Sequence, residues 1–144
     1  FALKWPAVGG GSVGLDALSA FFLVPVFLIG GLGPIYGLGY WSHRRHPANG
    51  RRLRLFWGTL VAGMALLVIA RHALIFLLGW EIMALSAFFL VTTEEHRPAS
   101  RQAGWIYFIS THVSTLALFA LFAVWRHATG TFAMEPAAPQ TLVQ

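Results

Sequence analysis

A glutamate and a histidine are the two titratable side chains that lie deep inside apolar stretches of this chain. Glu81 sits in LLGWEIMALSAFF, residues 77–89, and His112 sits in WIYFISTHVSTLALF, residues 105–119. An ionised carboxylate is costly in an apolar medium, so such a residue is expected to face a bundle interior or a water-filled cavity and to mark an ion or proton route. Desolvation favours the neutral acid and a nearby cation favours the ionised form, so a carboxyl between these effects could take up and release a proton. A protonated glutamic acid that only joins two helices by a hydrogen bond is the alternative.

His112 could pass protons on, because the two imidazole nitrogens can exchange donor and acceptor roles near neutral pH. Hydroxyl side chains flank it in the sequence and could support a hydrogen-bonding path through water: Ser110, Thr111, Ser114 and Thr115. A neutral histidine that is hydrogen-bonded to a helix carbonyl is the competing interpretation. The presence of Glu81 on the preceding apolar segment favours a relay.

The composition places these residues in a membrane protein. The chain has 144 residues, of which 57% are hydrophobic and only 10% are charged, whereas a soluble domain carries roughly 25% charged residues. Four apolar segments, at about 15–41, 55–70, 74–93 and 104–126, approach the length of about 20 residues that crosses a bilayer. Lipid offers the backbone no hydrogen bonds, so each segment is expected to be a helix. The sequence predicts an all-α membrane protein with four transmembrane helices in a polytopic bundle, between an N-terminal segment (1–14) and a C-terminal tail (127–144).

These segments put both titratable residues well inside the membrane. At 1.5 Å per residue, Glu81 lies ~10 Å along its helix from Leu74, and His112 lies ~12 Å from Gly104. The third and fourth segments should be antiparallel neighbours. The two side chains are then expected to differ in height by several ångströms, a distance that one water molecule could span.

The basic residues predict the orientation. The loops at 42–54 and 94–103 lie on one side of a four-helix series and hold seven arginines, whereas the other side holds Lys4, Arg71 and Arg126. The positive-inside rule therefore puts both loops in the cytoplasm and both termini on the outer side of an inner (plasma) membrane. A nucleic-acid surface would need interleaved aromatic residues, which these loops lack. The start at Phe1, without the pattern of a signal peptide, indicates a portion of a longer chain.

Small residues predict close helix packing. Gly33 and Gly37 have GxxxG spacing, and Thr59 and Gly63 repeat a small-xxx-small pattern. Asp16 is expected to cap the first helix, where a carboxylate complements the helix dipole. Tryptophans near the segment ends are expected to form an interfacial belt: Trp5, Trp41, Trp57, Trp105 and Trp125.

No cofactor site is expected in this chain. It has no cysteine. His43 and His46 form an HxxH pair, but in an arginine-rich loop that makes a poor metal site. Glu94, Glu95 and His96 sit at a segment end and are expected to be solvated.

Three motifs resemble a known family. LDALSAFF (15–22), LIFLLGWEIMALSAFFLV (74–91) and GWIYFISTHVSTLALFALF (104–122) are similar to the antiporter-like proton-channel subunits shared by respiratory complex I, cation/proton antiporters and energy-converting hydrogenases. WEIMALSAFFLV, then AGWIYFISTH, then TGTF (129–132) resembles most the large antiporter-like subunit of formate hydrogenlyase and hydrogenase-4. The resemblance extends from about residue 12 to residue 134.

The resemblance implies a role for Glu81. It falls on the family's intramembrane glutamate, which pairs with a lysine on the following, broken helix in a switch driven by electron flow in a partner hydrophilic redox arm. The four helices would be the third to sixth of a longer subunit, with other membrane subunits as partners. Two departures stand out: the only lysine here is Lys4, and complex I members tend to have Arg and Asp at the positions of His112 and Thr115. This chain alone would hold half of the switch.

Three hypotheses follow. The first is a proton-translocating subunit, or part of one, in a complex I-like or hydrogenase-like complex, with Glu81 as the protonatable residue and His112 as its relay. Any oxidoreductase activity would then belong to the complex and not to this chain. The second is a component of an antiporter that exchanges Na⁺ or K⁺ for H⁺. The third is a structural piece that transports nothing.

Overall fold

The computed structural model describes residues 2–5, 11–40, 49–94 and 96–134. It contains four helices, α1 (Ala17–Tyr40), α2 (Gly50–Ile69), α3 (Ala73–Val91) and α4 (Pro98–Thr129), and two strands, β1 (Ala2–Trp5) and β2 (Gly11–Gly14). All four helices are long and apolar enough to cross a membrane. The predicted all-α membrane architecture is therefore confirmed, with a short antiparallel strand pair beside it.

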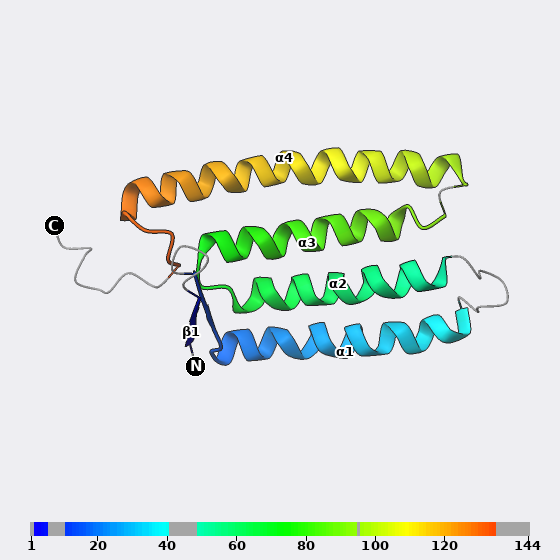
Figure 1. Cartoon of the computed structure of the whole chain (residues 1–144), viewed down its shortest axis with the longest axis horizontal. Coiled ribbons are helices and arrows are strands. Elements are labelled where there is room, and N and C mark those ends of the chain that lie inside the picture. The colour runs from blue at the N-terminus through cyan, green and yellow to red at the C-terminus, as the bar shows by residue number, and fades with distance from the viewer. Residues whose placement is uncertain (1, 6–10, 41–48, 95, 135–144) are drawn as a thin grey trace.

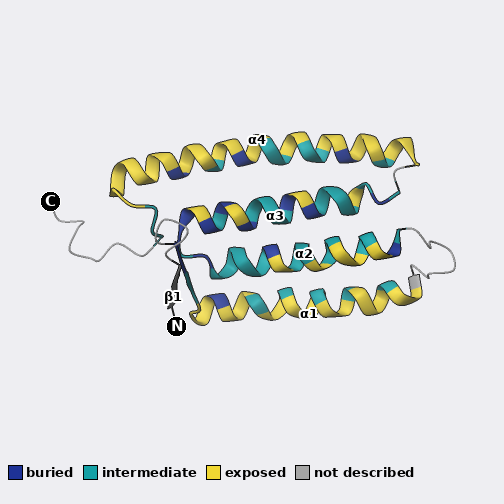
Figure 2. Ribbon diagram, viewed as in Figure 1, coloured by how far each residue is buried: buried dark blue, intermediate teal, exposed yellow. Residues whose placement is uncertain are grey.

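The helices lie side by side in sequence order, each antiparallel to the next (Figure 1). α3 packs between α2 and α4, so it is the most enclosed helix (Figure 2). In its most apolar 18-residue window 28% of the residues are buried, against 6% in α1. Glu81 therefore lies on the most buried of the four helices.

The layer has two different ends. At one end, here called the strand end, α1 begins, α2 meets α3, α4 finishes and the two strands lie (Figure 1). At the opposite end, here called the basic end, α1 finishes, α2 begins, α3 finishes and α4 begins. The basic end holds five of the described arginines, namely Arg51, Arg52, Arg54, Arg97 and Arg101, whereas Arg71 and Arg126 lie at the strand end.

Two helices extend beyond the apolar segments that predicted them. α2 begins at Gly50 and not near residue 55, and α4 runs from Pro98 to Thr129 and not from about 104 to 126. Residues 50–54 and 98–103, which were expected in loops, are therefore helical. Proline is well tolerated in a first helical turn, and polar residues can continue a helix into the headgroup region.

Glycines allow α2 and α3 to approach closely, as the small-residue pattern predicted. A Cβ atom added at Gly63 would lie 2.9 Å from the backbone nitrogen of Met83 and 3.1 Å from the carbonyl oxygen of Gly79. One turn away on α2, the hydroxyl of Thr59 shares a hydrogen bond of 2.8 Å with the hydroxyl of Ser86. Small side chains and an interhelical hydroxyl pair thus fix this contact.

A tryptophan joins α2 to α1 at a proline. Pro34 has no N–H to donate to the carbonyl of Gly30 one turn earlier. The indole Nε1–H of Trp57 donates to that carbonyl oxygen at 2.9 Å. Its ring also fills the space beside Gly33, where a Cβ atom would lie 2.2 Å from Trp57 Cζ2. The polar atom of Trp57 thus bonds to a neighbouring helix, and its place in an interfacial belt stays a prediction.

The strand end is held by several short segments. β1 pairs with β2 in antiparallel register, and Val13 of β2 forms a bridge with Ala70. After α4, Gly130 adopts a left-handed conformation (φ 74°) that ends the helix and turns the chain back. The following segment returns to α3, where the N–H of Ala73 donates to the carbonyl of Phe132 at 2.9 Å. Residues 131–134 of the expected tail are thus packed on the protein.

Candidate functional site

Glu81 lies in the middle of α3 and is half-buried. Its Oε1 atom is buried and has no hydrogen-bond partner among the described residues. A buried carboxylate oxygen without a donor is unfavourable when it is charged. The described residues therefore leave this oxygen atom to be satisfied by a group from elsewhere.

His112 is held by its own helix. Its Nδ1 lies 2.9 Å from the carbonyl oxygen of Phe108, and the two rings lie 4.0 Å apart. Because a carbonyl oxygen only accepts, Nδ1 carries the proton in this bond. Among the described residues no hydrogen bond engages Nε2.

Glu81 and His112 both lie on the strand-end side of one aromatic contact between α3 and α4. Phe88 lies two turns from Glu81 on the same side of α3, and its ring is 5.3 Å from that of Phe108, one turn before His112. Because Trp80 is level with Thr115, and α3 and α4 are antiparallel, Glu81 and His112 differ in height by about two residues, or ~3 Å. No hydrogen bond or ion pair joins the two side chains within the described part of the chain.

The four hydroxyl side chains around His112 do not form a path towards Glu81. Residues two positions apart point to opposite sides of a helix, so Ser110 and Ser114 lie across α4 from His112. The hydroxyl of Ser114 donates to the carbonyl of Ser110, and that of Thr111 to the carbonyl of Tyr107. Only Thr115 is buried among the four.

The sequence interpretation missed Trp80, which directly precedes Glu81. Its indole Nε1–H donates to the hydroxyl of Thr115 at 3.0 Å, and that hydroxyl donates in turn to the carbonyl of Thr111. This bond links α3 to α4 at the level of Glu81. Its position in the sequence could have indicated this interhelical role, because Trp80 lies in the middle of its apolar segment whereas the tryptophans assigned to the belt lie near segment ends.

A second polar cluster lies at the strand end. The carboxylate of Asp16 accepts the N–H of Ser19 at 2.7 Å, which confirms the predicted cap of α1, and it forms an ion pair with Arg71 at 2.5 Å. The hydrogen bond from the Ser19 backbone and, after it, the Ser19 hydroxyl and Arg71 lower the pKa of Asp16. No pattern in the sequence predicted the pairing of Asp16 with Arg71, which comes from the turn between α2 and α3.

His72 belongs to the same end. It is buried, and its Nδ1 accepts the N–H of Leu74 at 3.3 Å as the cap of α3. Burial lowers the pKa of His72, so the neutral ring is favoured there. This histidine therefore ends a turn and lies far along α3 from Glu81.

The remaining candidates contribute little to a site. Glu94 forms an ion pair with Arg97 at 3.2 Å, and His96 is exposed. The possible metal ligands His43 and His46, together with Trp41 and Glu95, lie outside the described residues. Within the described ranges, no group of three or more His, Asp or Glu side chains could hold a metal ion.

Comparison with known proteins identifies relatives of this helix layer. Residues 70–139, which include Glu81 and His112, match the family described as "NADH:quinone oxidoreductase/Mrp antiporter, TM". The chain is 28% identical over 150 residues to NADH-quinone oxidoreductase subunit L of Mycobacterium tuberculosis, covering 96% of this chain and 23% of that protein. It is 27% identical over 118 residues to hydrogenase-4 component B of Escherichia coli, covering 81% of this chain and 17% of that protein. NADH-ubiquinone oxidoreductase chain 5 of Neurospora crassa is 28% identical over 110 residues, covering 74% of this chain and 15% of that protein.

The chain thus spans less than a quarter of the length of these curated relatives. The family match and these relatives agree with the resemblance found in the motifs around Glu81 and His112. The four helices are those of an integral membrane protein. These matches support a place for the chain among antiporter-like membrane subunits, which include NADH-quinone oxidoreductase subunit L and hydrogenase-4 component B.

Proposed function

We propose that this chain forms part of a proton-translocating membrane subunit and that Glu81 is its protonatable switch residue. The observation that carries the proposal is the buried Oε1 atom of Glu81, which has no hydrogen-bond partner among the described residues. The proton is released when a donor or a cation approaches the carboxyl group.

His112 is the proposed relay neighbour. Its Nδ1 bond to Phe108 orients the ring and leaves Nε2 able to accept or donate a proton. The height difference of ~3 Å between Glu81 and His112 fits a single bridging water molecule. The hydroxyl of Thr115 accepts a hydrogen bond from the indole N–H of Trp80, which fixes α3 against α4 beside the carboxyl group of Glu81.

The proposed setting is a complex with other membrane subunits and a hydrophilic redox arm that supplies the driving force. The names of the relatives support a complex I-like or a hydrogenase-4-like assembly. The excess of arginine at the basic end supports an orientation with that end in the cytoplasm and the strand end outside the inner membrane. A cationic side chain from outside the described residues is the proposed partner of Glu81.

The test is a Glu81→Gln substitution in the assembled complex, reconstituted in vesicles. Glutamine keeps the shape of the side chain but cannot release a proton, so we expect proton uptake coupled to turnover to fall by roughly tenfold or more. Glu94→Gln is the matched control, because it removes a carboxylate that is ion-paired with Arg97 at the end of α3. Undiminished proton flux in Glu81→Gln, with normal flux in the control, would leave a structural role only.

A second candidate is a component of a Na⁺ or K⁺/H⁺ antiporter, because the description of the matched family includes such an antiporter. The carboxyl group of Glu81 would then alternate between a proton and a metal cation. The same vesicles distinguish the two functions. Proton flux that responds to a sodium or potassium gradient, and loses this response in Glu81→Gln, would favour the antiporter.

A further inference from the structure

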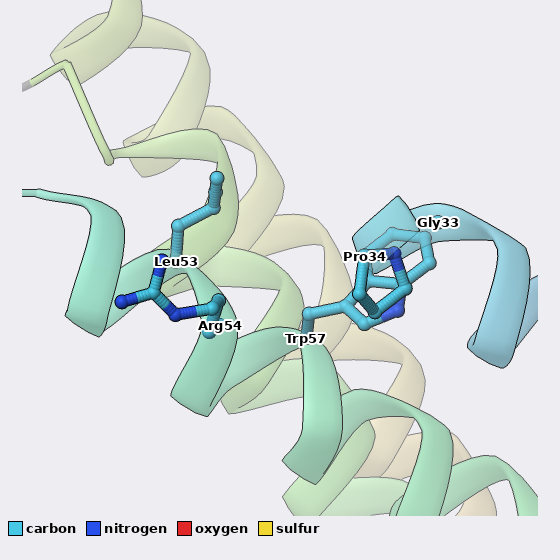
Figure 3. Close-up of a pocket in the computed structure, with 5 residues that line it drawn as sticks. All are labelled: Gly33, Pro34, Leu53, Arg54 and Trp57. Atoms are coloured by element: carbon cyan, nitrogen blue, oxygen red, sulfur yellow. The ribbon is translucent and has the colours of Figure 1, made fainter. Parts of the chain in front are cut away.

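A small apolar cavity lies between α1 and α2 near the basic end. Gly33 and Pro34 of α1 and Leu53, Arg54 and Trp57 of α2 line it (Figure 3). Its volume is about 190 Å³, which exceeds the volume of about 150 Å³ at which an engineered apolar cavity binds benzene. The surface that lines the cavity is almost entirely carbon, so an apolar chain fits it and water does not.

The walls of this cavity are fixed by the contact between Trp57 and α1. The indole is held in place by its 2.9 Å hydrogen bond to the carbonyl oxygen of Gly30. Gly33 leaves the room that the indole ring occupies, because a Cβ atom there would overlap Trp57 Cζ2 at 2.2 Å. The cavity is therefore a preformed feature of the α1–α2 contact.

Positive charge lies next to the cavity, on the side of the membrane surface. Arg54 is exposed, and in Figure 3 its side chain extends away from Pro34 and Trp57. It runs back towards the start of α2, since a Cβ atom at Gly50 would lie 3.6 Å from its Nη1. Arg51, one turn earlier, is exposed as well. Within the described residues no ion pair engages either guanidinium group.

Arg52 differs from these two arginines. Its guanidinium carbon lies 5.4 Å from the ring centre of Phe89, on the α3 side of α2. It is therefore directed away from the cavity. The charge beside the cavity thus comes from Arg51 and Arg54.

The depth of these groups matches the two parts of a phospholipid. Trp57 lies seven residues along α2 from Gly50, or ~10 Å, which corresponds to the upper part of the acyl chains when the start of α2 is at the membrane surface. Arg51 and Arg54 then lie at headgroup level, where basic side chains attract anionic lipids. We propose that this cavity and its two arginines bind one anionic phospholipid, with an acyl chain against Trp57 and Pro34 and the phosphate at Arg51 and Arg54.

The proposal is tested by photolabelling of the whole membrane protein in phosphatidylcholine vesicles. The probe is a photoactivatable phosphatidylglycerol present at a low fraction, and labelled peptides are mapped by mass spectrometry. We expect labelling of residues 30–34 and 53–57. Arg54→Gln should reduce that labelling about fivefold, the attraction that one basic side chain contributes near a membrane surface.

Two controls make the result decisive. Arg101→Gln removes an exposed arginine at the same end of the layer but on α4, and it should leave the labelling unchanged. A photoactivatable phosphatidylcholine with the same acyl chains should label these residues several-fold less. Equal labelling by both lipids, an equal loss in Arg54→Gln and Arg101→Gln, or no labelling because a neighbouring protein segment fills the cavity would each overturn the proposal.

Discussion

The indole N–H of Trp80 donates to the hydroxyl of Thr115 across the contact between α3 and α4, at 3.0 Å. Thr115 is 5% exposed, so the bond lies inside the helix layer. It is the polar link nearest in sequence to Glu81, which follows Trp80 directly. The relative rotation and height of α3 and α4, and with them the spacing of Glu81 and His112, depend on this bond.

A double-mutant cycle should measure this link. Trp80→Phe removes the donor and Thr115→Val removes the acceptor, and the double variant removes both. Interhelical hydrogen bonds in membrane proteins contribute about 0.6 kcal/mol on average and at most about 1.7 kcal/mol. We expect a coupling free energy in that range from unfolding of the intact protein in mixed micelles. Additive losses in the two single variants would show that the bond contributes nothing.

Two glycines of α2 should respond in opposite ways to alanine. Gly63→Ala places a methyl group 2.9 Å from the backbone of Met83, so α2 and α3 must separate, at a cost of about 1–3 kcal/mol in unfolding free energy. Gly58→Ala is the control, because nothing lies within 4 Å of a Cβ atom there. It should stabilise the helix by up to about 1 kcal/mol. Equal effects of the two substitutions in thermal unfolding would contradict the close approach of α2 and α3.

The strand end should lose stability in acid. Asp16 has a lowered pKa because the Ser19 backbone and hydroxyl, and then Arg71, favour its ionised form. The unfolded chain, whose carboxyl keeps its ordinary pKa near 3.8, then binds the proton more readily than the folded protein does. The contribution of Asp16 is complete above pH 4 and declines as the pH falls through the lower folded-state value.

Asp16→Asn is the variant that isolates this effect. Asparagine can still cap α1 but cannot form the ion pair with Arg71. We expect the variant to unfold at a lower temperature than the unchanged protein at pH 6, and the difference to narrow towards pH 2.5. A difference that stays constant over this pH range would show that ionisation of Asp16 contributes nothing to stability, and no difference at any pH would assign the stabilisation to the cap alone.

The sequence predicted the elements that composition determines. Four apolar segments of sufficient length become four helices, because lipid leaves the backbone no other way to satisfy its hydrogen bonds. The approach of α2 to α3 at Gly63 was predictable for a similar reason, since small residues in a one-turn repeat indicate close packing. The depth of Glu81 followed from counting residues along its helix.

The contacts around Glu81 could not be predicted in the same way. α3 is apolar on all its sides apart from Glu81 and Ser86, so no amphipathic pattern reveals which face meets α4. The hydrogen bonds of Trp80 and Trp57 depend on how each helix is rotated about its axis. Until the partner of a tryptophan in the middle of a helix is known, the sequence indicates only that it packs in the core. The early starts of α2 and α4 were hidden because their first turns are polar, as headgroup-level helix ends often are.

The hydrogen bond from Trp57 to Gly30 links the residue types that positions 34 and 57 can hold. Pro34 has no backbone N–H for the carbonyl of Gly30, and the indole N–H of Trp57 takes its place as the donor. Trp57 can therefore be replaced without loss of this hydrogen bond only if residue 34 has a backbone N–H. If Pro34 is substituted first, the helix regains its own backbone hydrogen bond. If Trp57 is substituted first, the carbonyl oxygen of Gly30 is left without a donor. Substitution at these two positions should therefore run in one direction.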